Sequence, residues 1–176
     1  FSVCYRVERS GEEGFLKAFN FANFFLLANA HGASTSVVDV MSEMLAAYKY
    51  ERDLSALCKS KNVTKVSFVR DAGEQTVSGY AIPMVPYLVF EVADGGDVRT
   101  QLSFATSVEV SWKLRSLHSV AVGLRQLHLI DVSHQDLKPS NVLLFSNESK
   151  IGDLGRSVCM TLQAPHDGQA FAGDLT

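Results

Sequence analysis

Apolar and polar residues alternate in the first stretch of the sequence, where Val3, Tyr5 and Val7 stand at every second position. This period of two predicts a half-buried strand. Residues 8–14 are polar and contain glycine, which predicts a hairpin turn. Residues 15–19 are mostly apolar and predict the return strand of the hairpin.

A helix is predicted over residues ~38–60, after a loop of small and polar residues at 29–36. One face of this helix carries, at spacings of three and four, Met41, Met44, Tyr48, Ser55 and Cys58. Glu51 lies on the same face. A carboxylate buried there alone would cost several kcal/mol, so a buried Glu51 requires a basic partner. The alternative, that Glu51 lies at the edge of the stripe and reaches water, is equally open.

Two further strand-like segments, residues 66–70 and 80–92, are separated by turn-prone residues at 71–74. The second segment leads into Ala93-Asp94-Gly95-Gly96-Asp97, which predicts a flexible connector. The expected division of the chain is therefore a first part at residues 1–93 and a second part at residues 94–176.

The second part is predicted to begin with a helix over residues ~108–130. Its expected buried face consists of Val110, Leu114, Leu117, Ala121, Leu124 and His128. A hairpin follows, with a strand at 142–145, a turn at 146–149 and a return at 150–155. This order of elements predicts an α+β fold, in which a β-rich part with one main helix precedes the beginning of a helical part.

Composition limits the class of protein. The 176 residues are 47% hydrophobic with a net charge of -3, which suits one domain with a real core and implies no large nucleic-acid or polybasic membrane-binding surface. Three cysteines without metal-ligand spacing fit a reducing, cytoplasmic setting. The most apolar stretch, residues 19–30, is shorter than the ~20 residues needed to cross a bilayer, so no membrane insertion is expected. Neither end of the sequence resembles a natural terminus, and both look cut.

Candidate chemistry gathers between residues 134 and 155. Asp136, Asn141 and Asp153 carry the hard oxygen ligands that suit Mg²⁺, and Lys138 follows Asp136 by two positions. A carboxylate, a basic group and a metal pair that converge on one place suit phosphoryl transfer, where catalysis is mainly positioning and charge neutralisation. Any one of these residues alone is more simply a solvated loop residue, but the ordered set favours a site.

The segment from His134 to Asn141, which reads His-Gln-Asp-Leu-Lys-Pro-Ser-Asn, resembles the H-R-D-L-x-x-x-N catalytic loop of serine/threonine protein kinases. Asp153-Leu154-Gly155 resembles the D-F-G metal-binding element of the same family. The resemblance implies that Asp136 is the catalytic base, that Lys138 lies near the transferred phosphate, and that Asn141 and Asp153 hold Mg²⁺ on ATP.

Upstream residues extend the resemblance to a two-lobe kinase fold. Lys17 matches the third-strand lysine that binds the α- and β-phosphates, and Glu51 matches the helix glutamate that pairs with it. The other implied nucleotide contacts are the backbone groups of Glu91 and Ala93 on adenine and the side chain of Leu143 beneath it. Phe90 would guard the back of the adenine pocket, and residues 1–4 resemble the end of a glycine-rich loop.

The implied function is ATP- and Mg²⁺-dependent phosphorylation of Ser or Thr hydroxyls in protein substrates, by a domain of which this chain is an incomplete piece. Three departures from the family pattern support an alternative, a catalytically silent kinase-like binding module or scaffold. Phe15 replaces the usual alanine of the adenine roof, Gln135 replaces an arginine, and Ser55 replaces an apolar residue. A small-molecule phosphotransferase is a lesser alternative. The sequence does not indicate the substrate or the oligomeric state.

Overall fold

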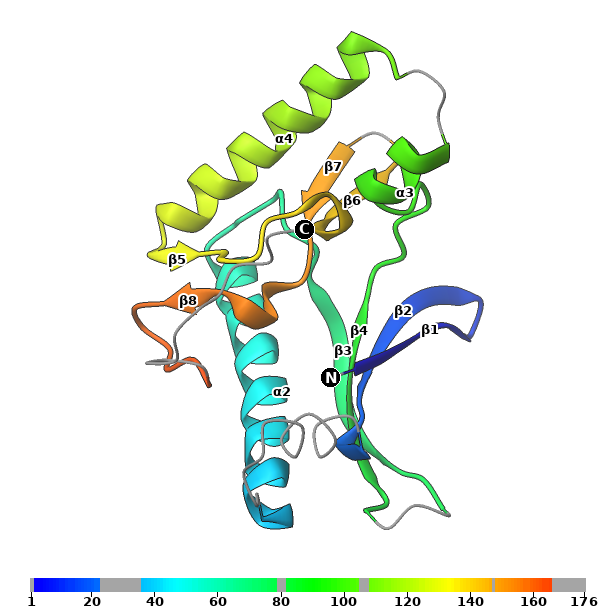
Figure 1. Ribbon diagram of the computed structural model, residues 1–176, viewed down its shortest axis with the longest axis vertical. Coiled ribbons are helices and arrows are strands. Elements are labelled where there is room, and N and C mark those ends of the chain that lie inside the picture. Colours follow the sequence, from blue (N-terminus) through cyan, green and yellow to red (C-terminus); the bar gives the residue numbers. More distant parts are fainter. Residues whose placement is uncertain (1, 23–35, 79–81, 105–107, 147, 166–176) are drawn as a thin grey trace. The chain divides into compact units, whose positions relative to one another are not determined.

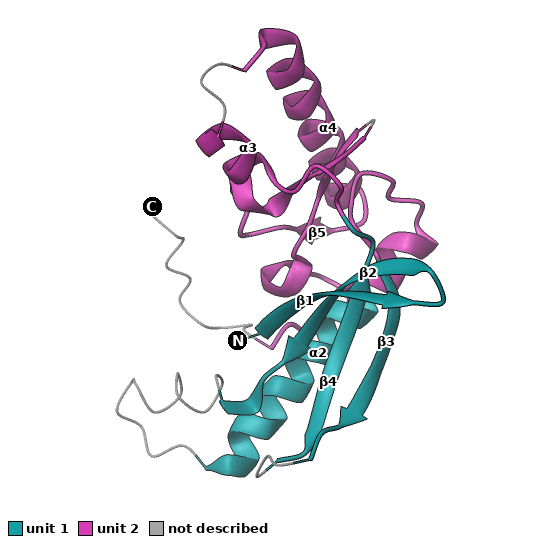
Figure 2. Cartoon of the chain, turned by 90° about the vertical axis from the view of Figure 1, so that its right-hand side faces the viewer, with its two compact units in different colours: residues 1–53, 69–92 teal, residues 54–68, 93–176 magenta. Residues whose placement is uncertain are grey.

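The computed structural model describes residues 2–22, 36–78, 82–104, 108–146 and 148–165 (Figure 1). Contacts divide the chain into two compact units, coloured separately in Figure 2. The first unit comprises residues 1–53 and 69–92, and the second comprises residues 54–68 and 93–176. The boundary falls within helix α2 (Val37–Ser60), whose last turns belong to the second unit. No sequence pattern indicated that residues 54–68 group with the second unit.

The first unit contains a four-stranded antiparallel sheet in the order β1-β2-β4-β3. The strands are β1 (Ser2–Arg9), β2 (Glu12–Phe19), β3 (Val69–Thr76) and β4 (Met84–Phe90). The predicted first hairpin is confirmed, but its predicted turn at 8–14 is too wide. Pairing continues to Arg9 opposite Glu12, so the turn contains only Ser10 and Gly11, both with positive φ. Two left-handed residues match the twist of the flanking strands, which is why this short turn suffices.

The turn predicted at 71–74 is wrong, because these residues lie inside β3 and pair with β4. Two local features make a strand of a turn-prone sequence. The ladder is irregular between Val69 and Asp71, which accommodates the extra residue as a bulge. Gly73 lies under the ring of Tyr87, whose hydroxyl oxygen would be 2.8 Å from a Cβ at that position. The glycine therefore leaves room for the Tyr87 ring of the neighbouring strand β4.

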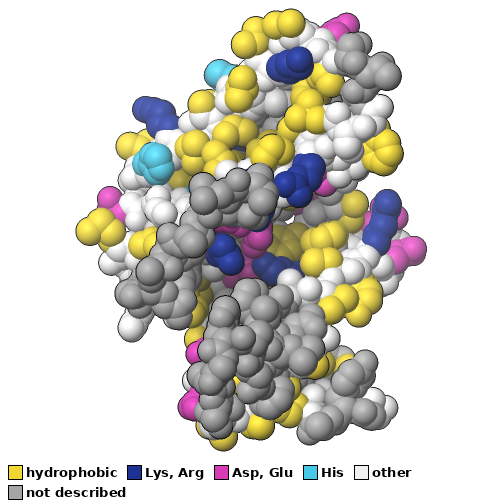
Figure 3. Space-filling model, viewed as in Figure 1, with side chains coloured by type: hydrophobic (Ala, Val, Ile, Leu, Met, Phe, Trp, Pro, Cys, Tyr) yellow, Lys and Arg dark blue, Asp and Glu magenta, His cyan; other side chains and the backbone are white. Residues whose placement is uncertain are grey.

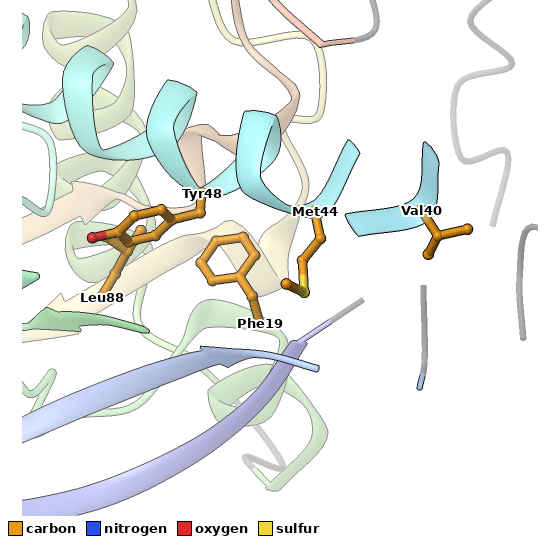
Figure 4. Packing of buried hydrophobic residues seen from close by; sticks show 5 residues of the cluster. All are labelled: Phe19, Val40, Met44, Tyr48 and Leu88. Carbon is orange, nitrogen blue, oxygen red and sulfur yellow. The ribbon is translucent and has the colours of Figure 1, made fainter. Parts of the chain in front are cut away.

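The core of the first unit lies between the sheet and α2 (Figure 4). Its buried members are Phe19, Val40, Met44, Tyr48 and Leu88. The rings of Phe19 and Tyr48 meet edge to face with centroids 5.7 Å apart, a favoured aromatic arrangement. The predicted stripe on α2 is confirmed at Met44, Tyr48, Ser55 and Cys58, which are buried, whereas its first member, Met41, is only half-buried. The loop predicted at 29–36 falls almost entirely outside the described residues.

The second unit contains α3 (Val98–Phe104), α4 (Val110–His128) and several short elements. The strands β6 (Val142–Phe145) and β7 (Glu148–Ile151) form a hairpin, and β5 (Val132–Ser133) pairs with β8 (Val158–Cys159). Short 3-10 turns lie at η1 (Pro139–Asn141) and η2 (Leu154–Arg156). The hairpin prediction is confirmed, but Glu148 and Ser149 belong to β7 and not to the turn, and the return strand ends at Ile151 and not at residue 155. Helix α3 had no counterpart among the predicted elements.

Helix α4 exists where it was predicted, but it buries the opposite face. The buried residues are Ser116, Ser119, Gly123 and Leu127, whereas Val110, Leu114 and Leu117 are 69%, 61% and 64% exposed. Gly123 explains the orientation. A Cβ there would lie 2.9 Å from Ile151 Cδ1 and 3.0 Å from the Lys65 carbonyl oxygen, so only a glycine surface lets α4 approach β7 this closely. Among the described residues, no helix combines the length and apolar character needed to cross a membrane.

Candidate active site

In the first unit, Lys17 on β2 and Glu51 on α2 form an ion pair. The Lys17 Nζ lies 2.9 Å from Glu51 Oε1 and 2.8 Å from Oε2, and the two side chains are 17% and 3% exposed. The expectation that a buried Glu51 has a basic partner is therefore confirmed. A charge pair removed from water depends on both partners, because loss of one leaves a desolvated charge. The pair thus fixes an ammonium group on the face of the sheet that looks toward α2.

Phe15 lies on the same face of β2 as Lys17, because alternate residues of a strand point to one side. Its cross-strand neighbour on β4 is Phe90, which packs partly against the core of the unit. The phenyl ring of Phe15 is 42% exposed, so it lies beyond the edge of that core.

Glu91 follows Phe90, and its carboxylate lies 3.7 Å from Arg70. Ala93 begins a turn, because its backbone carbonyl accepts a hydrogen bond from the Gly96 amide.

In the second unit, His134 anchors the catalytic-loop segment from inside. The imidazole is buried, and its Nε2 lies 3.0 Å from the Gly152 carbonyl oxygen. The His134 carbonyl accepts hydrogen bonds from the Asp136 amide at 2.9 Å and from the Ser157 hydroxyl at 3.3 Å. Ser157 is fully buried and was not identified from the sequence, since a lone serine after a loop carries no signal. The backbone immediately before Asp136 is therefore held from both sides.

The Asp136 carboxylate is positioned by two neighbours on the same segment. Lys138 Nζ lies 3.1 Å from Asp136 Oδ2. The Asn141 side-chain amide donates to the Asp136 carbonyl at 2.9 Å and to its Oδ2 at 3.3 Å. Asn141 is buried at the end of a turn that Pro139 begins, so its amide has little freedom. The structure thus brings together three of the four residues expected to converge, namely Asp136, Lys138 and Asn141.

The β6–β7 hairpin links Asn141 to Asp153. The Gly152 amide donates to the Asn141 carbonyl at 2.8 Å, and Val142 pairs with Ile151. A Cβ on Gly152 would lie 2.8 Å from Leu143 Cδ1, so this glycine permits the close approach. A glycine directly before Asp153 is the sequence feature that indicates this close approach. Asp153 itself has φ 58° and ψ 73°, a left-handed backbone that costs ~1–2 kcal/mol without compensation.

The donor set of this unit suits a hard divalent cation. The side-chain NH₂ group of Asn141 donates to Asp136, so the side-chain oxygen of Asn141, Oδ1, is the atom that remains to bind a metal ion. Asp153 adds a carboxylate two residues after Ile151, the last residue of β7. In the described part of the chain, no three His, Cys, Asp or Glu residues cluster as a complete metal cage. Two protein oxygens nevertheless fit Mg²⁺, which retains water and takes phosphate oxygens as its other ligands.

Comparison with known proteins identifies the family of the chain. The family model described as protein kinase domain matches residues 29–174, which include Glu51, Asp136 and Asp153. Greatwall serine/threonine-protein kinase of Danio rerio is 33% identical over 119 residues, 66% of this chain and 12% of the relative. Serine/threonine-protein kinase chk-1 of Caenorhabditis briggsae is 26% identical over 156 residues, 86% of this chain and 30% of the relative. Serine/threonine-protein kinase ppk18 of Schizosaccharomyces pombe is 36% identical over 72 residues, 40% of this chain and 6% of the relative. The chain therefore spans well under two thirds of the length of these relatives.

Proposed function

We propose, since the chain belongs to the protein kinase domain family, that it transfers the γ-phosphoryl group of ATP to Ser or Thr hydroxyls of protein substrates. The observation that carries this proposal is the held carboxylate of Asp136, fixed by Asn141 and accompanied by Lys138. A base must be positioned before its pKa matters, and here the positioning is built into the loop.

Each residue has a role in this proposal. Asp136 orients the substrate hydroxyl and accepts its proton, a contribution of ~10²–10⁴-fold for a typical general base. Lys138 stabilises the charge of the phosphoryl group in transfer, and Lys17 binds the α- and β-phosphates while Glu51 fixes its ammonium. The backbone groups of Glu91 and Ala93 and the side chain of Leu143 contact adenine. Asn141 and Asp153 would hold Mg²⁺, which supplies charge neutralisation on the phosphates.

A test of the reaction class uses purified protein that contains this chain, ATP labelled on its γ-phosphate, and a mixture of Ser- and Thr-containing acceptor peptides. The unmodified protein should transfer label, and both Asp136→Asn and Asp153→Ala should abolish the transfer. Label transfer that survives in either variant contradicts the assigned roles. Label on tyrosine peptides alone, or on small alcohols alone, contradicts the serine/threonine assignment.

A catalytically silent kinase-like module is the second candidate, and the exposed ring of Phe15 is the observation that favours it. A thermal melt with Mg·ATP tests nucleotide binding, because a ligand that binds the folded state raises the apparent stability, and the label-transfer assay then tests turnover. A silent scaffold that binds no nucleotide gives no shift with or without Mg²⁺. A silent module that binds nucleotide gives a shift but no label transfer.

The cellular setting and the partners are part of the proposal. A cytoplasmic location is supported by the three cysteines, all free thiols, of which Cys58 and Cys159 are buried. Burial, with the Cys159 thiol nearby, raises the pKa of Cys58 to about 12, so this thiol is an inert packing group rather than a reactive one. The partner expected from the reaction is a protein that presents a Ser or Thr hydroxyl.

A further inference from the structure

The connector at residues 93–97, which follows β4 and leads to α3, lies against the β6–β7 hairpin. Its sequence, with two glycines in five residues, predicts a flexible segment. The structure pairs it with β6 instead. The Gly95 amide donates to the Leu144 carbonyl at 3.0 Å, and the Leu144 amide donates to the Gly96 carbonyl at 2.9 Å. The connector is therefore hydrogen-bonded to β6 in the way that a neighbouring strand would be.

Both glycines are needed for this close pairing. A Cβ on Gly95 would lie 2.9 Å from Leu144 Cβ and 3.2 Å from the Leu144 carbonyl oxygen. Gly96 has φ 70°, and its amide closes a turn on the Ala93 carbonyl at 3.0 Å. Glycines also lose more conformational freedom than other residues when a segment becomes ordered. A connector of this composition therefore gains from a side-chain contact that keeps it in place.

One side-chain hydrogen bond supplies that contact. Ser146, directly after β6, donates its hydroxyl to the Asp94 carboxylate. This bond lowers the pKa of Asp94, so the carboxylate remains ionised and acts as a charge-assisted acceptor. The other carboxylate of the connector, Asp97, accepts hydrogen bonds from the Thr100 amide at 2.9 Å and the Thr100 hydroxyl at 2.8 Å, at the start of α3. Asp94 thus joins the connector to the hairpin through its side chain.

The paired segments carry two of the groups proposed to contact adenine. The backbone of Ala93 is at the beginning of the connector, in the turn that the Gly96 amide closes. Leu143 lies on β6 and forms an antiparallel bridge with Asp97. The position of the Ala93 backbone relative to the Leu143 side chain therefore depends on how firmly the connector is held against β6.

We propose that Asp94 and Ser146 are positioning residues for the adenine base. Their hydrogen bond holds the connector against β6, so that Ala93 and Leu143 are already in place when the base arrives. This inference rests on the proposed function, because it concerns the same nucleotide site. Without the bond, nucleotide binding must also order the connector, and that cost lowers the affinity for the base. The phosphates contact other residues, so their binding should not change.

Adenosine and Mg·tripolyphosphate represent the two ends of the nucleotide, and isothermal calorimetry measures their affinities separately on purified protein that contains this chain. Asp94→Ala and Ser146→Ala should each weaken adenosine binding by about three- to tenfold, the range expected for loss of one exposed hydrogen bond. The Kd of Mg·tripolyphosphate should stay within about twofold of its value in the unmodified protein. Both side chains are exposed, so the variants should remain folded.

Two further variants assign the effect to the hydrogen bond. Ser146→Thr keeps a hydroxyl donor and should restore adenosine affinity to within about twofold of the unmodified protein. The double variant, Asp94→Ala with Ser146→Ala, should bind adenosine no more than about twofold more weakly than the poorer single variant, because the same contact is lost only once.

A second exposed hydrogen bond between a serine and a carboxylate, in the same unit, provides the matched control. The Ser111 hydroxyl donates to the Glu109 carboxylate at 3.1 Å at the beginning of α4. Figure 3 shows hydrophobic and basic side chains over this helix, and none of the residues proposed to contact the nucleotide belongs to it. Ser111→Ala should therefore leave the Kd of both ligands within about twofold of the unmodified protein.

Amide hydrogen exchange reports on the pairing itself, without any ligand. The Leu144 amide, which donates to the Gly96 carbonyl, should exchange about three- to tenfold faster in Asp94→Ala and in Ser146→Ala. The Gly152 amide, which donates to the Asn141 carbonyl at the other end of the hairpin, should keep its rate.

Several outcomes would overturn the positioning role. Unchanged adenosine affinity in Asp94→Ala and Ser146→Ala, in a protein that binds adenosine and transfers label, would remove the role and leave the proposed function intact. Equal weakening of adenosine and Mg·tripolyphosphate would show a general loss of structure. An unchanged exchange rate at Leu144 would show that the bond does not hold the connector. Failure of the unmodified protein to bind either ligand would overturn the proposed function, and the positioning role with it.

Discussion

At the scale of single residues, the chain keeps the charged residues of the kinase pattern in fixed positions. Several residues next to them in the sequence differ from that pattern. Lys17 is locked to Glu51 at 2.8 Å, and Asp136 is held by Asn141. Gln135 directly precedes Asp136 in the loop and has φ 62°, and its side-chain amide donates to the Ser133 hydroxyl at 2.5 Å. A neutral amide engaged in this way replaces a guanidinium, so the loop has lost one means of binding a phosphate.

The first prediction concerns regulation through this residue. Because Gln135 carries no charge to pair with a phosphorylated residue of the following segment, activity should not depend on phosphorylation there. Phosphatase treatment of active protein should leave the rate of label transfer within about twofold of its starting value. A Gln135→Arg variant, which restores the guanidinium, is the comparison. Loss of turnover in the unmodified protein after phosphatase treatment would refute the prediction.

The second prediction concerns Phe15, whose ring stands where kinases usually carry the methyl group of alanine. If the ring occupies space needed by adenine, Phe15→Ala should raise the affinity for Mg·ATP by about tenfold, a change equal to roughly 1.4 kcal/mol. The variant should remain folded, because the ring is 42% exposed and lies outside the core. Isothermal titration measures the affinity. Tyr5→Ala, which removes an exposed ring from the opposite face of the neighbouring strand, should change nothing. Weaker binding in Phe15→Ala would instead indicate stacking.

At the scale of elements, local pattern predicted most helices and strands, while contacts far apart in the sequence decided their faces. The β1–β2 hairpin and the stripe on α2 follow from period and turn residues. The turn predicted at 71–74 failed because Gly73 is matched to Tyr87 on β4, a pairing that no local window contains. The sequence pattern indicated only that a buried Glu51 needs a basic partner, and the kinase resemblance named Lys17 as that partner, 34 positions away.

The third prediction concerns helix α4, whose buried and exposed faces should contribute very differently to stability. Leu127 is fully buried, so Leu127→Ala should lower the free energy of unfolding by about 2–5 kcal/mol. Leu117 is 64% exposed, so Leu117→Ala should lower it by less than about 1 kcal/mol. Urea unfolding followed by circular dichroism measures both. The hydrophobic stripe in the sequence predicts the reverse, namely that Leu117→Ala is the more destabilising change. A larger loss of stability for Leu117→Ala would therefore contradict the orientation of α4 in the structure.

The fourth prediction concerns the ion pair that ties residues 63–68 to β7. The Lys65 ammonium, which is hydrogen-bonded to Glu148 at 2.6 Å, lowers the pKa of that carboxyl, with a smaller effect from Lys150. A lowered folded-state pKa means that the stabilisation is complete above the unfolded value and is lost as pH falls through the folded value. Thermal melts should therefore show stability falling below about pH 4.5, and Glu148→Gln should reduce that fall. An identical pH profile in Glu148→Gln would contradict this account.

At the scale of the whole molecule, the charged groups assigned to the nucleotide are divided between the two units. Lys17 and Glu51 belong to the first, and Asp136, Asn141 and Asp153 belong to the second. The second set lies within one short segment, residues 136–153, and was identified from its motifs, whereas Lys17 and Glu51 stand 34 positions apart and were identified by their match to family positions. Sequence motifs could not indicate the grouping of residues 54–68 with the second unit, which depends on contacts such as the Ser67 amide with the Ile151 carbonyl.

The fifth prediction follows from that division. If both units bind one Mg·ATP molecule, their contributions to its affinity are coupled, and the effects of changing them together are not additive. Lys17→Arg and Asp153→Ala should each weaken Mg·ATP binding by about tenfold or more, and the double variant should bind no more than about threefold more weakly than the poorer single variant. Lys113→Glu, on the outer face of α4, serves as a matched charge change with no effect. Losses that add fully in the double variant would show that the two sets of residues act on the nucleotide independently, or on different ligands.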